Sequence, residues 1–431
     1  MERLLHYIWK YKLYSFSPLV TTDGDPLQII DVGIPNTDAG PDFFNAKIKV
    51  NNTVWAGCVE IHDKASDWLA HHHDKDKAYD AVILHVTEKD DAAIFRTNGE
   101  PVPQLVLSVP EPIRNNMDWL LIQDKKAVSC LPFLQDIDPI HLTAWMAALL
   151  EERLERKTKD IYQLLEQYNN DWNEVFYISL TRSFGFGINS DAFEWLAKSL
   201  PLQYLRKQRN SHSQIEALLF GQAGMLEYPG ECAYYRLLQR EYRFFQKKYG
   251  LRQLEGSLFK NLRVRPGNFP YERLAQLAAI WHSYDTLFSL LLEAGTPREL
   301  KNYFRIPPSD YWKTHYHFRY ASPPKEKQIG ETSLNILLIN TVVPMFFAYG
   351  HYHKLPQYNE RALRLLEILP AEKNTVVYSF NRAGIPVRHA GDSQALIQLK
   401  RNYCEQKKCM YCRIGYCLLK KKWEDTTPRT G

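Results

Sequence analysis

Residues 38–85, DAGPDFFNAKIKVNNTVWAGCVEIHDKASDWLAHHHDKDKAYDAVILH, decide the fold that the sequence predicts. Residues 46–55 and 57–62 alternate in polarity, with an Asn-Asn turn signal inside the first, and residues 28–32 and 81–87 are apolar β-rich runs. These patterns predict strands. Ser66 and Asp67 are candidate helix caps between them, and residues 3–14 have the spacing of an amphipathic helix. The predicted order is helix, three strands, helix, strand.

Two carboxylates stand at informative places in this order. Asp42 follows a Gly-Pro turn just ahead of the second strand, and Glu60 lies in the third strand. His62 shares the face of Glu60 because side chains repeat every second residue along a strand. If the two strands form a hairpin, Asp42 and Glu60 converge at one end of the sheet and can bind Mg²⁺ or Mn²⁺. The alternative is a turn aspartate and an unrelated strand-edge carboxylate.

Pro41-Asp42 and Glu60-Ile61-His62, set in this element order, resemble the PD-(D/E)XK nuclease superfamily. The resemblance covers about the first quarter of the chain. It implies an α-β-β-β-α-β core and metal-dependent cleavage of DNA, with Asp42, Glu60 and His62 as catalytic residues. His62 stands where the superfamily has lysine, so the histidine either takes over the lysine's role or marks an altered site.

Nearly the whole chain also resembles an uncharacterised bacterial protein family known only as a domain of unknown function. The resemblance rests on five features, which are GPDF at 40–43, VEIH at 59–62, SDW at 66–68, ILHV at 83–86 and a cysteine-bearing tail. It implies no activity.

A second group of possible ligands lies at residues 71–76, HHHDKD. His73 with Asp76, or His71 with His73, can join the divalent ion, and His85 can approach it from the fourth core strand. Mixed histidine and carboxylate ligands are typical of metal hydrolases. The alternative is a polar helix end at which histidines complement the helix dipole, with His85 an ordinary core histidine.

The rest of the chain predicts an α+β protein in three parts. Residues 1–125 form the nuclease-like domain, residues 126–374 a mostly helical domain, and residues 375–431 a C-terminal region with a cysteine knot. Residues 334–349 are almost all apolar and predict a buried helix kinked at Pro344. In the loop 261–270, Arg263 and Arg265 can contact nucleic-acid phosphates or simply lie on the surface.

The tail carries Cys404, Cys409, Cys412 and Cys417 within fourteen residues. Four such thiolates can bind Zn²⁺ or a [4Fe-4S] cluster, and reduced structural thiols are the alternative. Lys407 and Lys408 give this region positive charge for DNA, although a solvated tail has the same composition.

Composition limits the remaining possibilities. The chain has 431 residues, a net charge of +5 and 45% hydrophobic residues, as is usual for a soluble globular protein. It lacks the ~20 apolar residues in a row of a membrane helix, a signal-peptide layout and the motifs of P-loop, dinucleotide-binding and serine-hydrolase proteins. A cytoplasmic location and no membrane partner are therefore expected, while the oligomeric state is open. Two hypotheses remain, a metal-dependent phosphodiesterase acting on DNA, or a non-catalytic nucleic-acid or protein-binding factor that keeps an altered nuclease fold.

Overall fold

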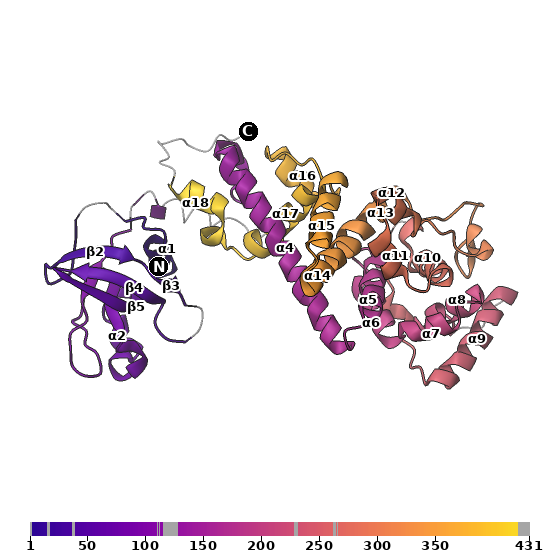
Figure 1. Cartoon of the computed structure of the whole chain (residues 1–431), viewed down its shortest axis with the longest axis horizontal. Coiled ribbons are helices and arrows are strands. Elements are labelled where there is room, and N and C mark those ends of the chain that lie inside the picture. Colours follow the sequence, from indigo (N-terminus) through magenta and orange to yellow (C-terminus); the bar gives the residue numbers. More distant parts are fainter. Residues whose placement is uncertain are drawn as a thin grey trace. The chain divides into compact units, whose positions relative to one another are not determined.

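The computed structural model describes residues 2–14, 18–36, 39–109, 111, 113–114, 128–227, 232–261, 264 and 266–420. It is an α+β structure, as the sequence predicts, with the sheet in the N-terminal part and a helical body after it (Figure 1). By compactness the chain forms two units rather than three parts. Unit 1 is Met1–Leu142 with Asn402–Gly431, and unit 2 is Thr143–Arg401. Part of the predicted C-terminal region therefore belongs to unit 2.

Unit 1 is built on one mixed sheet. Its strand order is β1-β2-β4-β5-β6-β7, with β3 paired to β4 at the side. The pairs β2–β4 and β4–β5 are antiparallel, whereas β6 runs parallel to β5 and β7 parallel to β6. The strands are β1 (Leu19–Val20), β2 (Pro26–Asp31), β3 (Ile34–Pro35), β4 (Phe43–Val50), β5 (Thr53–Lys64), β6 (Val82–Lys89) and β7 (Gln104–Val106).

The central hairpin differs in one respect from its prediction. Its turn is the Asn51-Asn52 pair, with Val50 opposite Thr53, so the break predicted before residue 57 is absent and β5 is continuous. Asn51 has a φ of 53°, the left-handed conformation that asparagine tolerates. Gly57 lies inside β5, where a Cβ would collide with the β6 neighbour Ile83. Glycine there allows the close approach of the parallel strand.

Short helical segments complete the first part of unit 1. Helix α1 (Glu2–Lys10) packs on β5 with Leu5, Ile8 and Trp9 buried. The predicted second helix is brief, because α2 (Asp67–Ala70) gives way to the 3-10 turns η1 (His73–Lys75) and η2 (Lys77–Tyr79). These segments form the crossover that joins the parallel strands β5 and β6.

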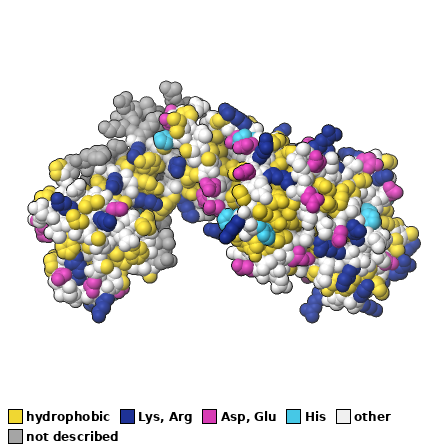
Figure 2. Space-filling view, in the orientation of Figure 1, with side chains coloured by type: hydrophobic (Ala, Val, Ile, Leu, Met, Phe, Trp, Pro, Cys, Tyr) yellow, Lys and Arg dark blue, Asp and Glu magenta, His cyan; other side chains and the backbone are white. Residues whose placement is uncertain are grey.

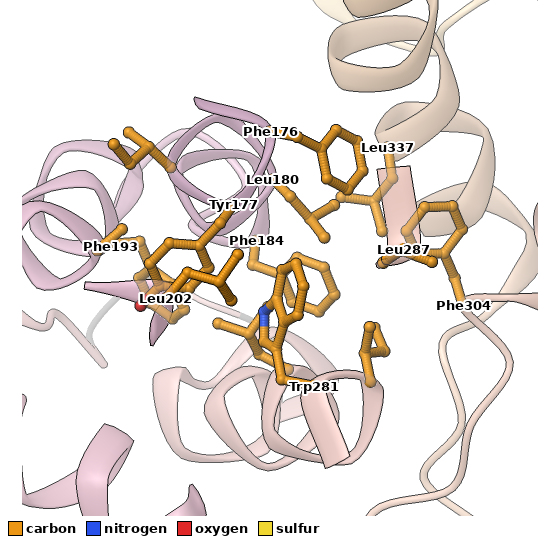
Figure 3. Close-up of a cluster of buried hydrophobic side chains, with 14 of the residues drawn as sticks. Phe176, Tyr177, Leu180, Phe184, Phe193, Leu202, Trp281, Leu287, Phe304 and Leu337 are labelled. Atoms are coloured by element: carbon orange, nitrogen blue, oxygen red, sulfur yellow. The ribbon is translucent and has the colours of Figure 1, made fainter. Parts of the chain in front are cut away.

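Unit 2 is helical and has one large core. Side chains from helices distant in sequence meet in it, including Phe176, Phe184, Trp281 and Leu337 (Figure 3). Its elements are α4 (Pro139–Gln167), α5 (Trp172–Phe184), α6 (Ser190–Ser199), α7 (Leu202–Lys207), α8 (His212–Gln222), α9 (Ala233–Tyr249), α10 (Pro270–Ser283), α11 (Leu287–Glu293), α12 (Pro297–Asn302), β8 (His315–His317), β9 (Tyr320–Ala321), α13 (Glu331–Leu337), α14 (Val343–His353), α15 (Pro356–Ile368), α16 (Thr375–Arg382) and α17 (Ala390–Leu399).

One helical stretch of the described chain, Glu331–His353, is long and apolar enough to cross a membrane. Buried residues make up 67% of its most apolar window, so it belongs to the interior of unit 2, as predicted for residues 334–349. A π-helical turn, Leu338–Val342, lies in this stretch and ends two residues before Pro344. Proline cannot donate to the preceding turn, and the wider turn accommodates it.

Candidate functional site

The hairpin of β4 and β5 brings Asp42 and Glu60 to the same end of the sheet. Phe43 lies opposite Val59, so the two acidic residues follow as neighbours across the strands. The Asp42 backbone N–H donates to Glu60 Oε2 at 3.1 Å, and the Ile61 N–H donates to Asp42 Oδ2 at 2.9 Å. Each carboxylate is thus held by the backbone of the other strand.

Three histidine rings gather beside Glu60. One ring nitrogen from each of His62, His71 and His73 lies within 4.8 Å of the other two. His71 Nδ1 is 3.1 Å from His62 Nε2, and Glu60 Oε1 is 3.4 Å from both His62 Nε2 and His73 Nε2. Two nitrogen ligands bound tetrahedrally to one zinc ion lie about 3.3 Å apart. The 3.1 Å and 3.4 Å separations are close to this value, and the three histidine nitrogens are near enough to one another to share a single ion.

Hydrogen bonds behind the cluster orient His62. Gln104 Nε2 donates to the Ala92 carbonyl at 3.1 Å, which leaves Gln104 Oε1 to accept from His85 Nδ1 at 3.2 Å. His85 Nε2 must then accept from His62 Nδ1, 2.8 Å away. The His62 proton is therefore on Nδ1, and Nε2 accepts from His71 Nδ1 at 3.1 Å while it lies 3.4 Å from Glu60 Oε1. Metal-bound histidines are held by partners of this kind.

Burial keeps the imidazole rings of His62 and His85 neutral. It lowers the pKa of His62 to about 2, with further lowering from the charges of His85 and His73, and lowers the pKa of His85 to about 4. Burial also raises the pKa of Glu60, although the hydrogen bond from His73 opposes this change. Glu60 Oε1 and His62 Nε2 lie 3.4 Å apart, and a cation bound between them would stabilise the charged form of Glu60.

Aromatic side chains fix the third histidine. His73 is 8% exposed, and its Nε2 has no hydrogen-bond partner among the described residues apart from the 3.4 Å approach to Glu60. Its ring stacks on Tyr79 with centroids 3.7 Å apart, and Trp68 meets both His73 and His85 edge-on. The aromatic wall holds the rings in place and leaves His73 Nε2 free for a ligand.

A fourth histidine lies on the Asp42 side. His6 Nε2, from α1, is 3.2 Å from Asp42 Oδ2. Burial alone would lower the pKa of His6, but the hydrogen bond and charge of Asp42 raise it overall. His6 keeps 28% of its side chain exposed, so a proton on it can exchange with solvent.

The structure brings some of the residues predicted for this site together and places others elsewhere. Glu60, His62, His73 and the alternative ligand His71 are together, with Asp42 next to them. Asp76 is exposed and its Oδ1 accepts from the Ala78 N–H at 2.9 Å, so this side chain caps η2 and is not one of the gathered donors. Sequence reasoning missed His6 and Gln104. Their only signal was a polar residue among apolar ones, which does not identify a partner.

The structure says less about the four basic residues that were expected to bind nucleic-acid phosphates. Arg263 and Arg265 lie outside the described residues. Lys407 is half-buried and Lys408 exposed, both just before the 3-10 turn η9 (Cys409–Tyr411).

Comparison with known families confirms the resemblance to a domain of unknown function. The model of a family described as "Protein of unknown function (DUF2851)" matches residues 2–375. The chain belongs to the DUF2851 family. No curated protein and no solved structure matches it. The DUF2851 match contains the whole histidine cluster, and the resemblance to nucleases stays a prediction.

The seven cysteines of this DUF2851 protein lie among the described residues and are free thiols. Cys130 precedes η3 (Leu131–Asp136) and keeps some exposed surface, but its thiol is enclosed by protein. Burial raises the pKa of Cys130, and the nearby thiols of Cys404, Cys412 and Cys409 raise it further. Cys417, in α18 (Arg413–Lys420), is instead affected by Lys420 and Asp138, besides its own burial.

Proposed function

We propose that unit 1 is a metal-dependent phosphodiesterase that acts on DNA. The observation that carries the proposal is the group of His62, His71 and His73, whose ligand nitrogens lie within 4.8 Å of one another, with Glu60 Oε1 3.4 Å from the Nε2 atoms of His62 and His73. A divalent ion supplies Lewis acidity and makes a hydroxide nucleophile available near neutral pH. Imidazoles suit Zn²⁺ or Fe²⁺, whereas Mg²⁺ and Mn²⁺ prefer oxygen ligands, so the three histidines favour Zn²⁺ or Fe²⁺ over Mg²⁺ or Mn²⁺.

The residues around the donors have separate parts in this proposal. His85 and Gln104 hold His62 in the tautomer with an unprotonated Nε2. Glu60, His62 and His73 are buried whereas His71 is exposed, so His71 marks the side from which substrate enters. His6, paired with Asp42, exchanges a proton with the leaving group or water.

DNA is the proposed substrate because of the element order and the placement of Asp42 and Glu60. Charge gives limited support, since Figure 2 shows lysine and arginine side chains interspersed with acidic and apolar ones on the visible face. We place the protein in the cytoplasm, where its seven free cysteines stay reduced.

The second hypothesis, a binding factor without catalysis, has one observation in its favour. The residue in the lysine position of the nuclease pattern, His62, is neutral because burial lowers its pKa to about 2. A neutral ring cannot supply the positive charge that lysine gives. On this hypothesis the ion braces the fold and performs no chemistry.

Metal binding and cleavage are tested on the full chain. Mn²⁺ and Zn²⁺ titrations give the affinity, and bis(p-nitrophenyl) phosphate and linear duplex DNA report cleavage. Glu60→Gln and His73→Asn are expected to weaken binding and cleavage by at least about 100-fold, because each removes a direct ligand. The matched control is His72→Asn, since His72 is exposed and has a φ of 60° that asparagine tolerates.

Each outcome separates the hypotheses. Equal metal affinity in the wild type and both ligand variants contradicts the site. Metal binding that depends on these ligands, without cleavage of either substrate, supports the binding factor and rejects the phosphodiesterase.

A further inference from the structure

Helix α9 of unit 2 carries a row of basic residues on one face. This basic row consists of Arg236, Arg240, Arg243 and Lys247, which stand four, three and four residues apart and are all exposed. Helix residues three or four positions apart lie on the same face, with Cβ atoms about 5–6 Å from one another. Lys248 is exposed next to the row, and Glu241 is the single acidic residue of the helix. The exposed face of α9 is therefore strongly positive.

The opposite face of α9 is fixed in the core of unit 2. Its buried side chains are Tyr235, Leu238, Tyr242 and Phe245. The Tyr242 ring packs so closely on Gly221 of α8 that a Cβ there would overlap ring atoms. Because the helix cannot rotate about its axis without breaking these contacts, the basic row stays on the surface.

Within the described part of the chain, little neutralises the basic row. The side chains of Arg243 and Lys247 form no hydrogen bond or ion pair with a described residue. Glu241 accepts from Gln214 Nε2 at 3.0 Å and lies 3.4 Å from Arg240 Nη2, yet the Arg240 side chain is 76% exposed. The charges of Arg243 and Lys247, and most of the Arg240 side chain, thus face solvent.

The stability of α9 does not account for the basic row. Like charges three or four residues apart weaken a helix. Lys247 lies in the last turn, where a cation complements the helix dipole, but Arg240 and Arg243 lie before that turn. Two exposed arginines at these positions therefore serve binding of an anionic partner better than they serve the helix.

The composition of the exposed face favours a nucleic acid over a membrane. Phe244, which is 59% exposed, is the one large apolar side chain that α9 exposes. A helix that lies on a membrane inserts a wide apolar face, and α9 uses its own apolar face in the core. From Arg236 to Lys247 the row is about 16 Å long, and duplex DNA carries one negative charge per about 1.7 Å of its axis. A row of this length therefore faces several phosphates at once.

We propose that the exposed face of α9 binds the phosphate backbone of DNA through Arg240, Arg243 and Lys247. Such binding releases counterions, depends on salt and needs neither a metal ion nor a particular base sequence. It uses no ligand of the histidine cluster. The proposal therefore holds whether unit 1 cleaves DNA or not.

The test is fluorescence anisotropy of labelled duplex DNA with the full chain, at about 50 to 200 mM salt and with EDTA to prevent metal-dependent cleavage. The variant with Arg240→Gln, Arg243→Gln and Lys247→Gln is expected to bind at least about 10-fold more weakly. The slope of log affinity against log salt is expected to be smaller by about 2.7, because each lost phosphate contact removes about 0.9. Glutamine has a similar helix propensity, so α9 itself is preserved.

The matched control makes the same change in charge at exposed positions of three other helices of unit 2, with Lys159→Gln, Arg364→Gln and Arg382→Gln. This control is expected to keep the wild-type slope. Far-ultraviolet circular dichroism in the same buffer shows whether each variant is folded. If the triple α9 variant is unfolded, Arg243→Gln alone replaces it, with an expected slope change of about 0.9.

Four results overturn the proposal. These are no binding of duplex DNA by the wild type at about 50 mM salt, an unchanged affinity and slope in the α9 variant, an equal loss in the α9 variant and the control, and tighter binding of poly-glutamate or of phosphatidylserine vesicles than of DNA. The last result would assign the basic row to an acidic protein or to a membrane. Metal binding and cleavage by unit 1 are measured separately, so none of these results decides them.

Discussion

At the scale of single residues, hydrogen bonds from outside the histidine cluster determine which ring nitrogen of His62 carries the proton. The Ala92 carbonyl orients the Gln104 amide, and through it the tautomers of His85 and His62. Gln104 touches none of the four donors, so its effect on metal binding acts through His62. It is a positioning residue.

Gln104→Leu is therefore expected to weaken Mn²⁺ or Zn²⁺ binding by about 10–100-fold without removing a ligand. Leucine has nearly the same size but cannot accept from His85, which then loses its preferred tautomer. Isothermal titration measures the change. Gln28→Leu, at an exposed position of β2, is the matched control, and equal affinities of the two variants would contradict this role.

Glu216 shows how tertiary contacts override a local pattern. Its position three residues after Ser213 predicts a helix cap, but α8 begins at His212 and Glu216 is 1% exposed. Its carboxyl accepts from Tyr234 at 2.6 Å, Ser309 at 2.8 Å and Trp312 at 3.1 Å. Burial raises the pKa of Glu216 to about 7, although these hydrogen bonds oppose the shift.

This raised pKa predicts a pH-dependent stability. Below about pH 4.5 the carboxyl is protonated in both folded and unfolded chains, and between about 4.5 and 7 the folded state alone holds the proton. Stability thus falls as pH rises through this window, by about 3 kcal/mol in total, and is constant above it. Urea unfolding of unit 2 at pH 4.5 and 8 should show this loss relative to Glu216→Gln. The exposed Glu166→Gln should follow the wild type, and parallel curves for Glu216→Gln and the wild type would refute the assignment.

The candidate site was predictable where its residues are close in sequence. Glu60 and His62 follow from strand alternation, and Asp42 from its place before the hairpin. The contacts of His62 with His85 and of His85 with Gln104 span 23 and 19 residues, and no local pattern encodes them. The sheet register alone brings these residues together.

At the scale of elements, α8 and α9 meet at a glycine. Gly221 faces the ring of Tyr242 so closely that a Cβ would overlap ring atoms, and the Tyr242 hydroxyl donates to Gln222 at 3.0 Å. The ring is therefore held on both sides and cannot move away cheaply. A small residue here sets the distance between the two helices.

Gly221→Ala is expected to destabilise unit 2 by about 1–3 kcal/mol, because overpacking outweighs the gain of about 1 kcal/mol from the higher helix propensity of alanine. Thermal or urea unfolding measures the difference. Gly330→Ala is the control, since a Cβ at Gly330 has nothing within 4 Å. A stabilised Gly221→Ala protein would show that the helices separate without cost.

The sequence predicts whether a segment is a helix or a strand more often than it predicts the exact geometry of the helix or strand. The strands of unit 1, the turn at Asn51-Asn52 and the buried helix around Pro344 follow from periodicity, turn chemistry and the run of apolar residues. The π-helical turn Leu338–Val342 does not, because it depends on neighbouring helices. The shortness of α2 has the same cause, since ring packing around Trp68 replaces helical continuation.

At the scale of the whole molecule, the two units have separate cores, and the candidate metal-ligand sites belong to one of them. The histidine cluster and the four cysteines are in unit 1, whereas the core around Trp281 is in unit 2. An ion that binds only the folded state stabilises it by mass action. Such an ion should therefore act on one unit.

Calorimetry of the full chain is expected to show two transitions, one of which Mn²⁺ or Zn²⁺ stabilises by about 2.7 kcal/mol at a concentration 100 times the dissociation constant. Glu60→Gln should abolish this shift, and Gly221→Ala should lower the other transition alone. An equal shift of both transitions by the metal in Glu60→Gln would mean that the ion binds elsewhere.

The division of unit 1 into two sequence segments also bears on how the protein is made. A ribosome synthesises Met1–Leu142 before unit 2 and Asn402–Gly431 after it, so unit 2 is available to fold while unit 1 still lacks its later segment. During that interval the early sheet has no access to the later cysteines. A chain released too soon would thus have a finished helical unit beside an unfinished partner, and chaperones would meet the early segment rather than the helices.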